Sequence, residues 1–503
     1  MDIKSLKDKI LQLAIQGKLV PQNENDEPAS VLLEKIRKEK EQLIKDKVIK
    51  KEKLLQEISE EEMLFQLPKK WKWCRLGDIS IKITDGSHNP PKGEHTKTDY
   101  IMLSSQNINQ GTIVNLDKSR YLSEDNYNIE NKRTQINRGD ILLTIVGTIG
   151  RSCIYNESLK ITLQRSVAVI DTKYCNIYLK YLFDSPKIQA YFNENASGTA
   201  QKGIYLNQLR QTVIPLPPLE EQERIVLKIE ELFKLIDELD NNKQDLLENI
   251  ANTRNKVLQL AIQGKLVEQC EDDEPASILL EKIREEKEQL IKDKVIKKEK
   301  PLPEISEEEK VFELPKGWEW CRLANISNIK GGKRIPAGKK LLDEPTEHMY
   351  IRVADMKNGT IIEDDIKYIS DDIYEQIKNY YIEKDDIYMT IAGTIGRVGT
   401  IPDKFHMANL TENASKIRVY KVDKDFIFRI LNSQYIQIQI SNKTKKVGQP
   451  KLALNQIESL LIPLPPLEEQ KRIVAKVDLI MDYLDKLQQE IDSQEIILED
   501  ILQ

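Results

Sequence analysis

The sequence has 503 residues, of which 40% are hydrophobic and 31% are charged, and its formal net charge is −6 at pH 7. A chain this long exceeds one ordinary core and is too apolar for a disordered protein, so we expect several domains. Its longest apolar runs are only of strand length, which argues against a membrane span or secretory signal and predicts a cytoplasmic protein. The five cysteines form no C-x-x-C pair, so we expect free thiols.

An internal repeat organises the chain, because LQLAIQGKLV at residues 11–20 returns at residues 258–267, an offset of 247. The 27 residues that start at Glu27 return with two changes, and the motif W-x-W-C-R-L at Trp71 returns at Trp318. GTIGR and IPLPPLEEQ also occur twice, at offsets of 246 and 248. The matched segments are expected to have the same role in both copies. The divergent segments between them are expected to have related but different roles.

The repeat predicts an α+β fold. Two mixed α/β globules are expected at residues 68–218 and 315–466, where β-branched runs alternate with glycines and where residues 177–193 have the composition of a packed helix. Long antiparallel coiled-coil helices are expected to join the globules with pseudo-two-fold, circular symmetry. The helical segments are an N-terminal hairpin, a central spacer and a C-terminal helix, expected at residues 1–67, 219–314 and 467–503.

The helical segments start with a short helix that ends before Gly17 and a second helix that runs from about Pro28 to about Lys53, with its copy running to about Lys300. From Ile225 onward, apolar residues recur at the 4-3 spacing of a coiled coil. The copy of this helix stops at the residue that corresponds to 255. The N-terminus supplies the missing part in the same heptad register, because residues 250, 253, 257 and 260 correspond to Ile3, Leu6, Ile10 and Leu13. We therefore expect the N-terminal helix to complete the C-terminal one.

The first globule contains a polar, proline-stiffened loop, TDGSHNPPKGEH, at residues 84–95. Its donors could reach DNA base edges, and an ordinary turn is the alternative. Asn-Pro-Pro at 89–91 is similar to a motif of amino-methyltransferases, but a lysine stands where that motif stacks an aromatic ring on a flipped base. A glycine and polar stretch, residues 197–209, precedes the PLPP motif. The candidate DNA contacts in these two segments are Thr84, Ser87, His88, Asn89, Lys92, Gln201 and Lys202.

Both globules carry GTIGR, which lacks the G-x-G-x-x-G spacing and the following helix of a cofactor loop, so we expect a strand-end turn. Arg151 and Arg397 end this motif and are candidate phosphate contacts, with an ion pair at the edge of the core as the alternative. In the second globule, the most basic loop is GGKRIPAGKK at residues 331–340, and a glycine and polar stretch again precedes PLPP. The further candidates in that globule are Lys333, Arg334, Lys339, Gln449 and Lys451.

The net charge becomes informative when it is divided between segments. Residues 68–218 hold 20 Lys and Arg against 13 Asp and Glu, a balance of +7, and residues 315–466 hold 23 against 19, a balance of +4. The rest of the chain therefore carries −17. Basic globules on acidic helices suit contact with DNA phosphates. The sequence has no P-loop, no metal-ligand spacing around its four histidines and no paired nucleophile and base, which predicts a reader of DNA and not an enzyme.

The doubled order of the motifs, with W-x-W-C-R-L opening each globule and IPLPPLEEQ followed by R-I-V and a long helix closing it, resembles the specificity subunits of Type I restriction-modification systems. The resemblance covers essentially the whole chain. It implies two target-recognition domains, each reading one half of a split, asymmetric DNA sequence. It also implies two methyltransferase subunits, which bind S-adenosylmethionine, and restriction and translocase subunits, which use ATP and Mg. We expect this chain itself to hold no cofactor and no metal.

One feature departs from the resemblance, because Gly331-Gly332-Lys333 takes the place of the family's T-D-G-S-H in the second globule. Base-contact roles therefore do not transfer there residue by residue. The main alternative function is an elongated coiled-coil scaffold whose globules bind proteins, which would not retain DNA sequence-specifically. A stand-alone methyltransferase or nuclease is disfavoured by the missing cofactor and metal motifs.

Overall fold

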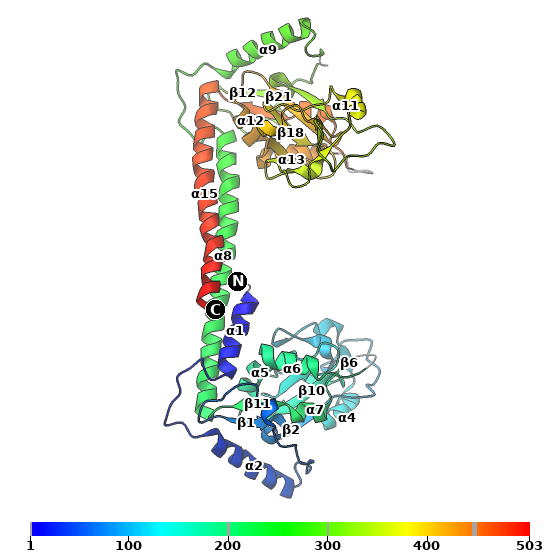
Figure 1. The fold of residues 1–503 in the computed structure, drawn as a ribbon, viewed down its shortest axis with the longest axis vertical. Coiled ribbons are helices and arrows are strands. Elements are labelled where there is room, and N and C mark those ends of the chain that lie inside the picture. Colours follow the sequence, from blue (N-terminus) through cyan, green and yellow to red (C-terminus); the bar gives the residue numbers. More distant parts are fainter. Residues whose placement is uncertain (1–2, 199–201, 299–300, 445–449, 503) are drawn as a thin grey trace. The chain divides into compact units, whose positions relative to one another are not determined.

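The computed structural model describes residues 3–198, 202–298, 301–444 and 450–502, which form two compact units (Figure 1). Unit 1 comprises the residues up to Lys243 together with those from Gln494 onward, and unit 2 comprises Gln244–Ser493. Each unit contains one globular part and a pair of packed helices. Among the described residues, no helix is long and apolar enough to cross a membrane. All five cysteines are free thiols, as predicted.

In unit 1, helix α1 (Ile3–Ile15) packs on the first part of helix α8 (Leu219–Ile262). Ile10 of α1 is buried in the same apolar cluster as Ile225 and Ile229 of α8. Lys7 Nζ lies 2.6 Å from a carboxylate oxygen of Asp237, and the two helices run antiparallel in Figure 1. The predicted end of α1 is confirmed, because Gly17 has a φ of +69°.

In unit 2, the last part of α8 packs in the same way on helix α15 (Leu467–Leu502). Val257 of α8 is buried in one cluster with Ile473 and Val477, and Arg254 lies 2.6 Å from Asp485. Helix α1 thus packs on the start of α8 in the same way as the end of α8 packs on the start of α15. The repeated helical frame is present in the fold, with one such helix pair in each unit.

The globular part of unit 1 is built from small sheets. Its four-stranded antiparallel sheet has the order β2-β10-β7-β8, and a three-stranded sheet, β6-β3-β9, includes one parallel pair. Two further strand pairs are β1 with β11 and β4 with β5. The strands are β1 Lys72–Arg75, β2 Lys82–Asp85, β3 Tyr100–Leu103, β4 Ile108–Asn109, β5 Thr112–Ile113, β6 Arg120–Leu122, β7 Ile141–Thr144, β8 Ser152–Ile154, β9 Lys160–Leu163, β10 Val167–Asp171 and β11 Val213–Leu216. The helices are α3 Leu76–Ile79, α4 Glu124–Thr134, α5 Asn176–Asp184, α6 Pro186–Glu194 and α7 Leu206–Gln211.

The globular part of unit 2 repeats the main sheet orders, with β13-β21-β18-β19, β17-β14-β20, β12 with β22, and β15 with β16. The strands are β12 Glu319–Arg322, β13 Ser327–Gly331, β14 Met349–Ile351, β15 Met356–Lys357, β16 Thr360–Ile361, β17 Lys367–Tyr368, β18 Asp386–Thr390, β19 Val398–Thr400, β20 Asn409–Leu410, β21 Ala414–Val419 and β22 Leu461–Leu464. The helices are α10 Leu323–Ile326, α11 Asp371–Ile377, α12 Lys424–Leu431, α13 Gln434–Lys443 and α14 Leu454–Glu458.

Two helix predictions need correction. The helix expected to reach about Lys53 ends at Lys45, as α2 (Ala29–Lys45), and its copy α9 (Ala276–Lys292) ends at the corresponding residue, each before a lysine with a positive φ. Helix α2 packs on α3 and lies apart from α1 in Figure 1, where a hairpin with α1 was expected. The single helix expected at residues 177–193 is two helices, because Pro186 begins a new one.

The repeated motifs form one packing network, which is present twice. The indole N–H of the buried Trp71 donates to Glu221 at 2.9 Å, and Gln22 donates to the other oxygen of this carboxylate at 2.5 Å. Burial raises the pKa of Glu221. Arg224 forms an ion pair with Asp26 at 2.6 Å. The same contacts recur in unit 2 between the corresponding residues Trp318, Glu469, Gln269, Arg472 and Asp273.

The network explains why these segments are matched while the rest of each globule diverges. It joins the helix pair to the first and last strands of each globular part, and every partner must be kept for the buried carboxylate to stay satisfied.

Candidate nucleic-acid interface

Loops from four separate segments meet at one edge of each globular part. In unit 1 this loop edge comprises residues 84–92, 145–148, 164–166 and 202–204, and in unit 2 it comprises residues 331–340, 391–394, 411–413 and 451–452. Backbone hydrogen bonds between these segments hold each edge together. Ile145 N donates to Ser166 O at 2.9 Å and Ile204 N donates to Ile145 O at 2.8 Å.

The T-D-G-S-H segment enters the edge of unit 1 at the end of β2. Gly86 packs so closely on β9 that a Cβ atom would lie 2.1 Å from Leu163 O. Ser87 is buried, and its N–H donates to Leu163 O at 2.7 Å while its carbonyl accepts from Arg165 N at 2.9 Å. Ser87 therefore anchors the loop through its backbone.

The buried carboxylate of Asp85 orients the next side chains. It accepts from His88 Nε2 at 2.7 Å and forms an ion pair with Arg133, while the His88 side chain stays 56% exposed. Asn89 and Lys92 are exposed beyond it, and Thr84 is half-buried on β2. The loop thus presents a histidine, an amide and a lysine to solvent.

The GTIG segments are strand-end turns, as predicted. In unit 1 the turn joins β7 to β8, and the buried Thr144 holds it by donating to Thr148 O and accepting from Arg151 N. In unit 2, Thr390 makes the corresponding contacts with Thr394 and Arg397. The motif therefore forms a turn that is stabilised by hydrogen bonds to its own backbone, and it is not a cofactor-binding loop.

The two arginines after these turns lie beside the turns and not among the other candidates. Arg151 is exposed and lines a cleft of about 710 Å³ together with Lys4 and Lys7 of α1 and Lys180 of α5. Arg397 is also exposed, and it donates to Met356 O at 3.3 Å.

The second glycine and polar stretch joins the loop edge in both units. The carbonyl of the exposed Lys202 accepts from Gly147 N at 3.3 Å, and the exposed Lys451 pairs with Ala392 in a strand bridge. The structure therefore brings the candidate lysines next to the GTIG turns. Gln201 and Gln449 lie outside the described residues.

The loop edge of unit 2 uses the same backbone frame. A Cβ atom on Gly332 would lie 2.2 Å from Thr411 O, and Lys333 N donates to Leu410 O at 2.8 Å, as Ser87 N does to Leu163 O. This register makes Lys333 the counterpart of Ser87 and Arg334 the counterpart of His88, a correspondence that the sequences alone leave open.

Three basic side chains of this edge contact partners within unit 2. Lys333 Nζ lies 5.7 Å from the centroid of the Tyr380 ring, and Lys339 pairs with Asp372 at 2.6 Å. Arg334 pairs with Glu412 at 2.5 Å and keeps 75% of its side chain exposed.

Two functional candidates were missed by the sequence reasoning. Arg165 and Glu412 occupy corresponding positions, because each lies two residues after the leucine that accepts the loop hydrogen bond, Leu163 or Leu410. Neither residue sits in a recognisable motif. The strand register alone places each beside a loop that is more than 70 residues away in sequence.

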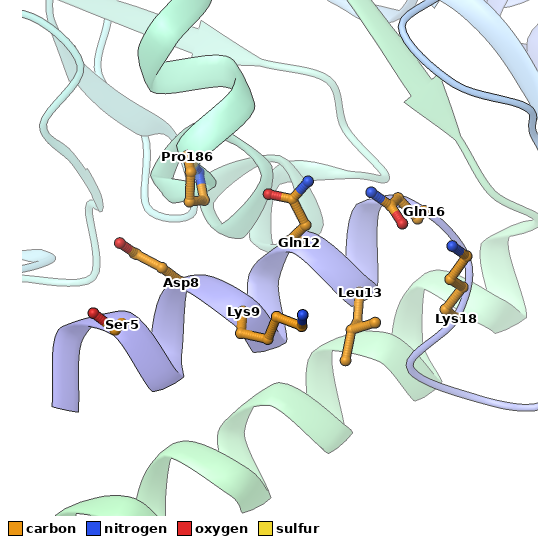
Figure 2. Close-up of a pocket in the computed structure, with 8 residues that line it drawn as sticks. All are labelled: Ser5, Asp8, Lys9, Gln12, Leu13, Gln16, Lys18 and Pro186. Atoms are coloured by element: carbon orange, nitrogen blue, oxygen red, sulfur yellow. The ribbon is translucent and has the colours of Figure 1, made fainter. Parts of the chain in front are cut away.

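The described residues contain no cluster of His, Cys, Asp and Glu that could hold a metal ion. A second open groove, of about 440 Å³, lies along α1, where Figure 2 shows Asp8 and Gln12 on the side that faces Pro186. Its lining mixes polar side chains with Leu13 and Pro186. The chemistry available at the loop edges is hydrogen bonding and charge, which suits phosphates and base edges.

Comparisons with known proteins agree with this architecture. A family model described as the Type I restriction modification DNA specificity domain matches residues 68–249 and 315–498. The specificity subunit of the Type I restriction enzyme EcoAI from Escherichia coli is 32% identical, over 96% of this chain and 90% of that protein. The EcoEI specificity subunit from Escherichia coli is 29% identical, over 98% of this chain and 91% of that protein.

A solved structure shares the fold. The HsdS subunit from Thermoanaerobacter tengcongensis has a TM-score of 0.52 and 19% identity, over 88% of this chain and 97% of that chain. A chain from a structure described as the basis of complex assembly and conformational transition of the type I R-M system has a TM-score of 0.55 and 19% identity, over 87% and 97%. With both units matched by the family model and nearly the whole chain aligned to the EcoAI subunit, this protein belongs to the family of Type I restriction-modification specificity subunits.

Proposed function

We propose that this chain is the sequence-specific DNA-recognition subunit of a Type I restriction-modification complex and that it reads a bipartite, asymmetric target. One observation carries the proposal: the two loop edges share a backbone frame but present different side chains, such as His88 in one and Arg334 in the other. Two domains that share a backbone arrangement but expose different side chains are suited to recognise two different half-sites. In this proposal the target-recognition domains are residues 68–218 and 315–466.

Charge supports the same function. The two proposed domains have balances of +7 and +4, and the exposed lysines of the loop edges can neutralise phosphates on either side of a base contact. The proposed DNA contacts are therefore the exposed candidates of the loop edges, with the buried Ser87 holding its loop in place. In this proposal, the acidic helices bind the protein partners.

The proposed partners are double-stranded DNA, two methyltransferase subunits and restriction and translocase subunits. The matched packing network, which appears once in each unit, suits two copies of one partner. Methyl transfer and ATP-driven steps are assigned to those partners. This chain is the non-catalytic subunit, which recognises the target and thereby determines where the partners act.

The test is to assemble the chain with its methyltransferase partner and to map methylated adenines in the modified DNA. We expect one split motif whose two halves differ. A short uninterrupted motif would contradict the bipartite reading, and a complex that retains DNA without any sequence preference would favour a scaffold that binds proteins through its globules.

A further inference from the structure

The corresponding positions of the two loop edges differ in charge. His88 and Arg165 occupy these positions at the edge of unit 1, whereas at the edge of unit 2 they are occupied by Arg334 and Glu412, which form an ion pair. Two of the backbone hydrogen bonds that place these residues recur, because Ser87 N and Lys333 N donate to Leu163 O and Leu410 O, and Gly86 N and Gly332 N donate to Val167 O and Ala414 O. On this shared part of the frame, the two edges present different charged side chains at corresponding positions.

Arg334 is held by one side of its guanidinium only. Its Nε donates to Glu412 Oε1 at 2.5 Å, and Thr411 Oγ1 donates to the other oxygen of that carboxylate at 3.1 Å. Within the described residues, the two terminal amino groups of Arg334 donate to no protein acceptor. The Glu412 side chain is 23% exposed, whereas that of Arg334 is 75% exposed. The pair therefore presents an outward fork of N–H donors, with Glu412 on one side of the guanidinium.

A fork of this kind matches guanine better than phosphate. The two terminal amino groups of arginine donate together to O6 and N7 of guanine, which is the commonest specific contact to a base edge. A carboxylate beside the fork repels a phosphate, but it can accept a hydrogen bond from N4 of the cytosine in the same base pair. The neutral sum of the pair thus disfavours the backbone and favours a G·C base pair.

We propose that Arg334 reads a guanine in the half-site recognised by unit 2 and that Glu412 positions its guanidinium. This inference rests on the proposed function and names one determinant of its specificity. In unit 1, Arg165 takes the place of Glu412 and His88 that of Arg334, so the same base pair is not read there. The contact belongs to one half-site only.

The test compares methylation motifs and binding for complexes that carry wild-type chain, Arg334→Ala, Arg334→Lys or Glu412→Gln. The matched control is Arg284→Ala, which removes another exposed arginine from a glutamate pair, with Glu281 at 3.3 Å on α9. Adenine methylation is mapped at sequence resolution, and binding is measured with duplexes in which each base of each half-site is varied in turn.

We expect Arg334→Ala to relax one guanine position in one half-site, with a loss of about tenfold or more in discrimination there. Arg334→Lys should relax the same position while keeping the salt dependence of binding, because a lysine keeps the charge but lacks the fork. Glu412→Gln should relax it in part, and Arg284→Ala should change nothing.

Three outcomes would overturn the inference. They are an unchanged motif with Arg334→Ala, relaxation in both half-sites, and a uniform loss of binding to all sequences, which would mark a phosphate contact. In all three outcomes the wild-type complex still methylates a split motif. Failure of the proposed function is a different result, because the wild-type complex would then show no split motif. Because Arg334 is exposed, its replacement is expected to leave folding and assembly intact.

Discussion

Substitution of Gly332 by alanine should disable one loop edge and leave the other working. A Cβ atom at Gly332 would lie 2.2 Å from Thr411 O and 2.3 Å from Leu410 O, where ordinary contact begins at 3.4 Å. The two backbone segments must therefore move apart by about 1 Å. That movement strains the hydrogen bonds from Gly332 N to Ala414 O, at 3.0 Å, and from Lys333 N to Leu410 O, at 2.8 Å.

Loss of these two bonds should cost about 2–4 kcal/mol, because each leaves a backbone group partly unsatisfied. For a unit of this size, that change lowers the melting temperature by about 5–10 °C. The shift also displaces Lys333 and Arg334, so binding to the half-site of unit 2 should fall by about tenfold or more.

The assay is thermal unfolding together with competition binding by the assembled complex, using duplexes in which one half-site at a time is scrambled. The neighbouring glycine provides the control, because a Cβ atom on Gly331 would meet Leu454 at 3.5 Å, an ordinary contact. Gly331→Ala should therefore behave like the wild type. Equal behaviour of the Gly331 and Gly332 variants would refute the reasoning.

Three other predictions follow from charge and register. Lys333→Ala should reduce the slope of log binding constant against log salt by about 1, whereas Lys45→Ala on α2 should leave it unchanged; equal slopes would remove Lys333 from the phosphate surface. The hydrogen bond from Arg322 lowers the pKa of Glu309 to about 2, so its stabilisation is complete above pH 4.5 and is lost as the pH falls toward 2. Glu309→Gln should flatten that part of a thermal-unfolding series against pH, and a parallel series would contradict it. A fragment of residues 1–255 should dimerise by pairing its unpartnered helical seam and, with a methyltransferase partner, direct methylation to an inverted repeat; a monomer in sedimentation analysis that still supports the original site would contradict it.

The helical frame could be predicted because its signal is repeated. Trp71, Glu221 and the residues around them must be kept together for one buried network to form, so both copies retain them and the repeat reveals the frame. The end of α2 at Lys45 gave no such signal. A backbone hydrogen bond from Val48 N to Leu43 O at 2.9 Å closes that helix, and the charged sequence looks helical beyond it.

The candidate site could be predicted only where a single segment carries it. The loop with His88 and the basic loop with Lys333 stand out as short polar stretches, and the structure places both at loop edges. Arg165 and Glu412 reach the same edges from the turns between β9 and β10 and between β20 and β21, where the neighbouring sequence reads as ordinary buried β-structure. Their proximity depends on strand register across the sheet, which no local pattern specifies.

The most direct test of two separate readers is a complex whose chain carries residues 68–218 twice, with the second copy in place of residues 315–466. The shared strand frame and the repeated Trp-Glu network should let this chain fold and assemble. Mapping of methylated adenines is then the deciding measurement. The account predicts that the asymmetric motif of the wild type becomes an inverted repeat of the half-site read by unit 1. An unchanged asymmetric motif, or a motif with no relation to either half-site, would contradict it.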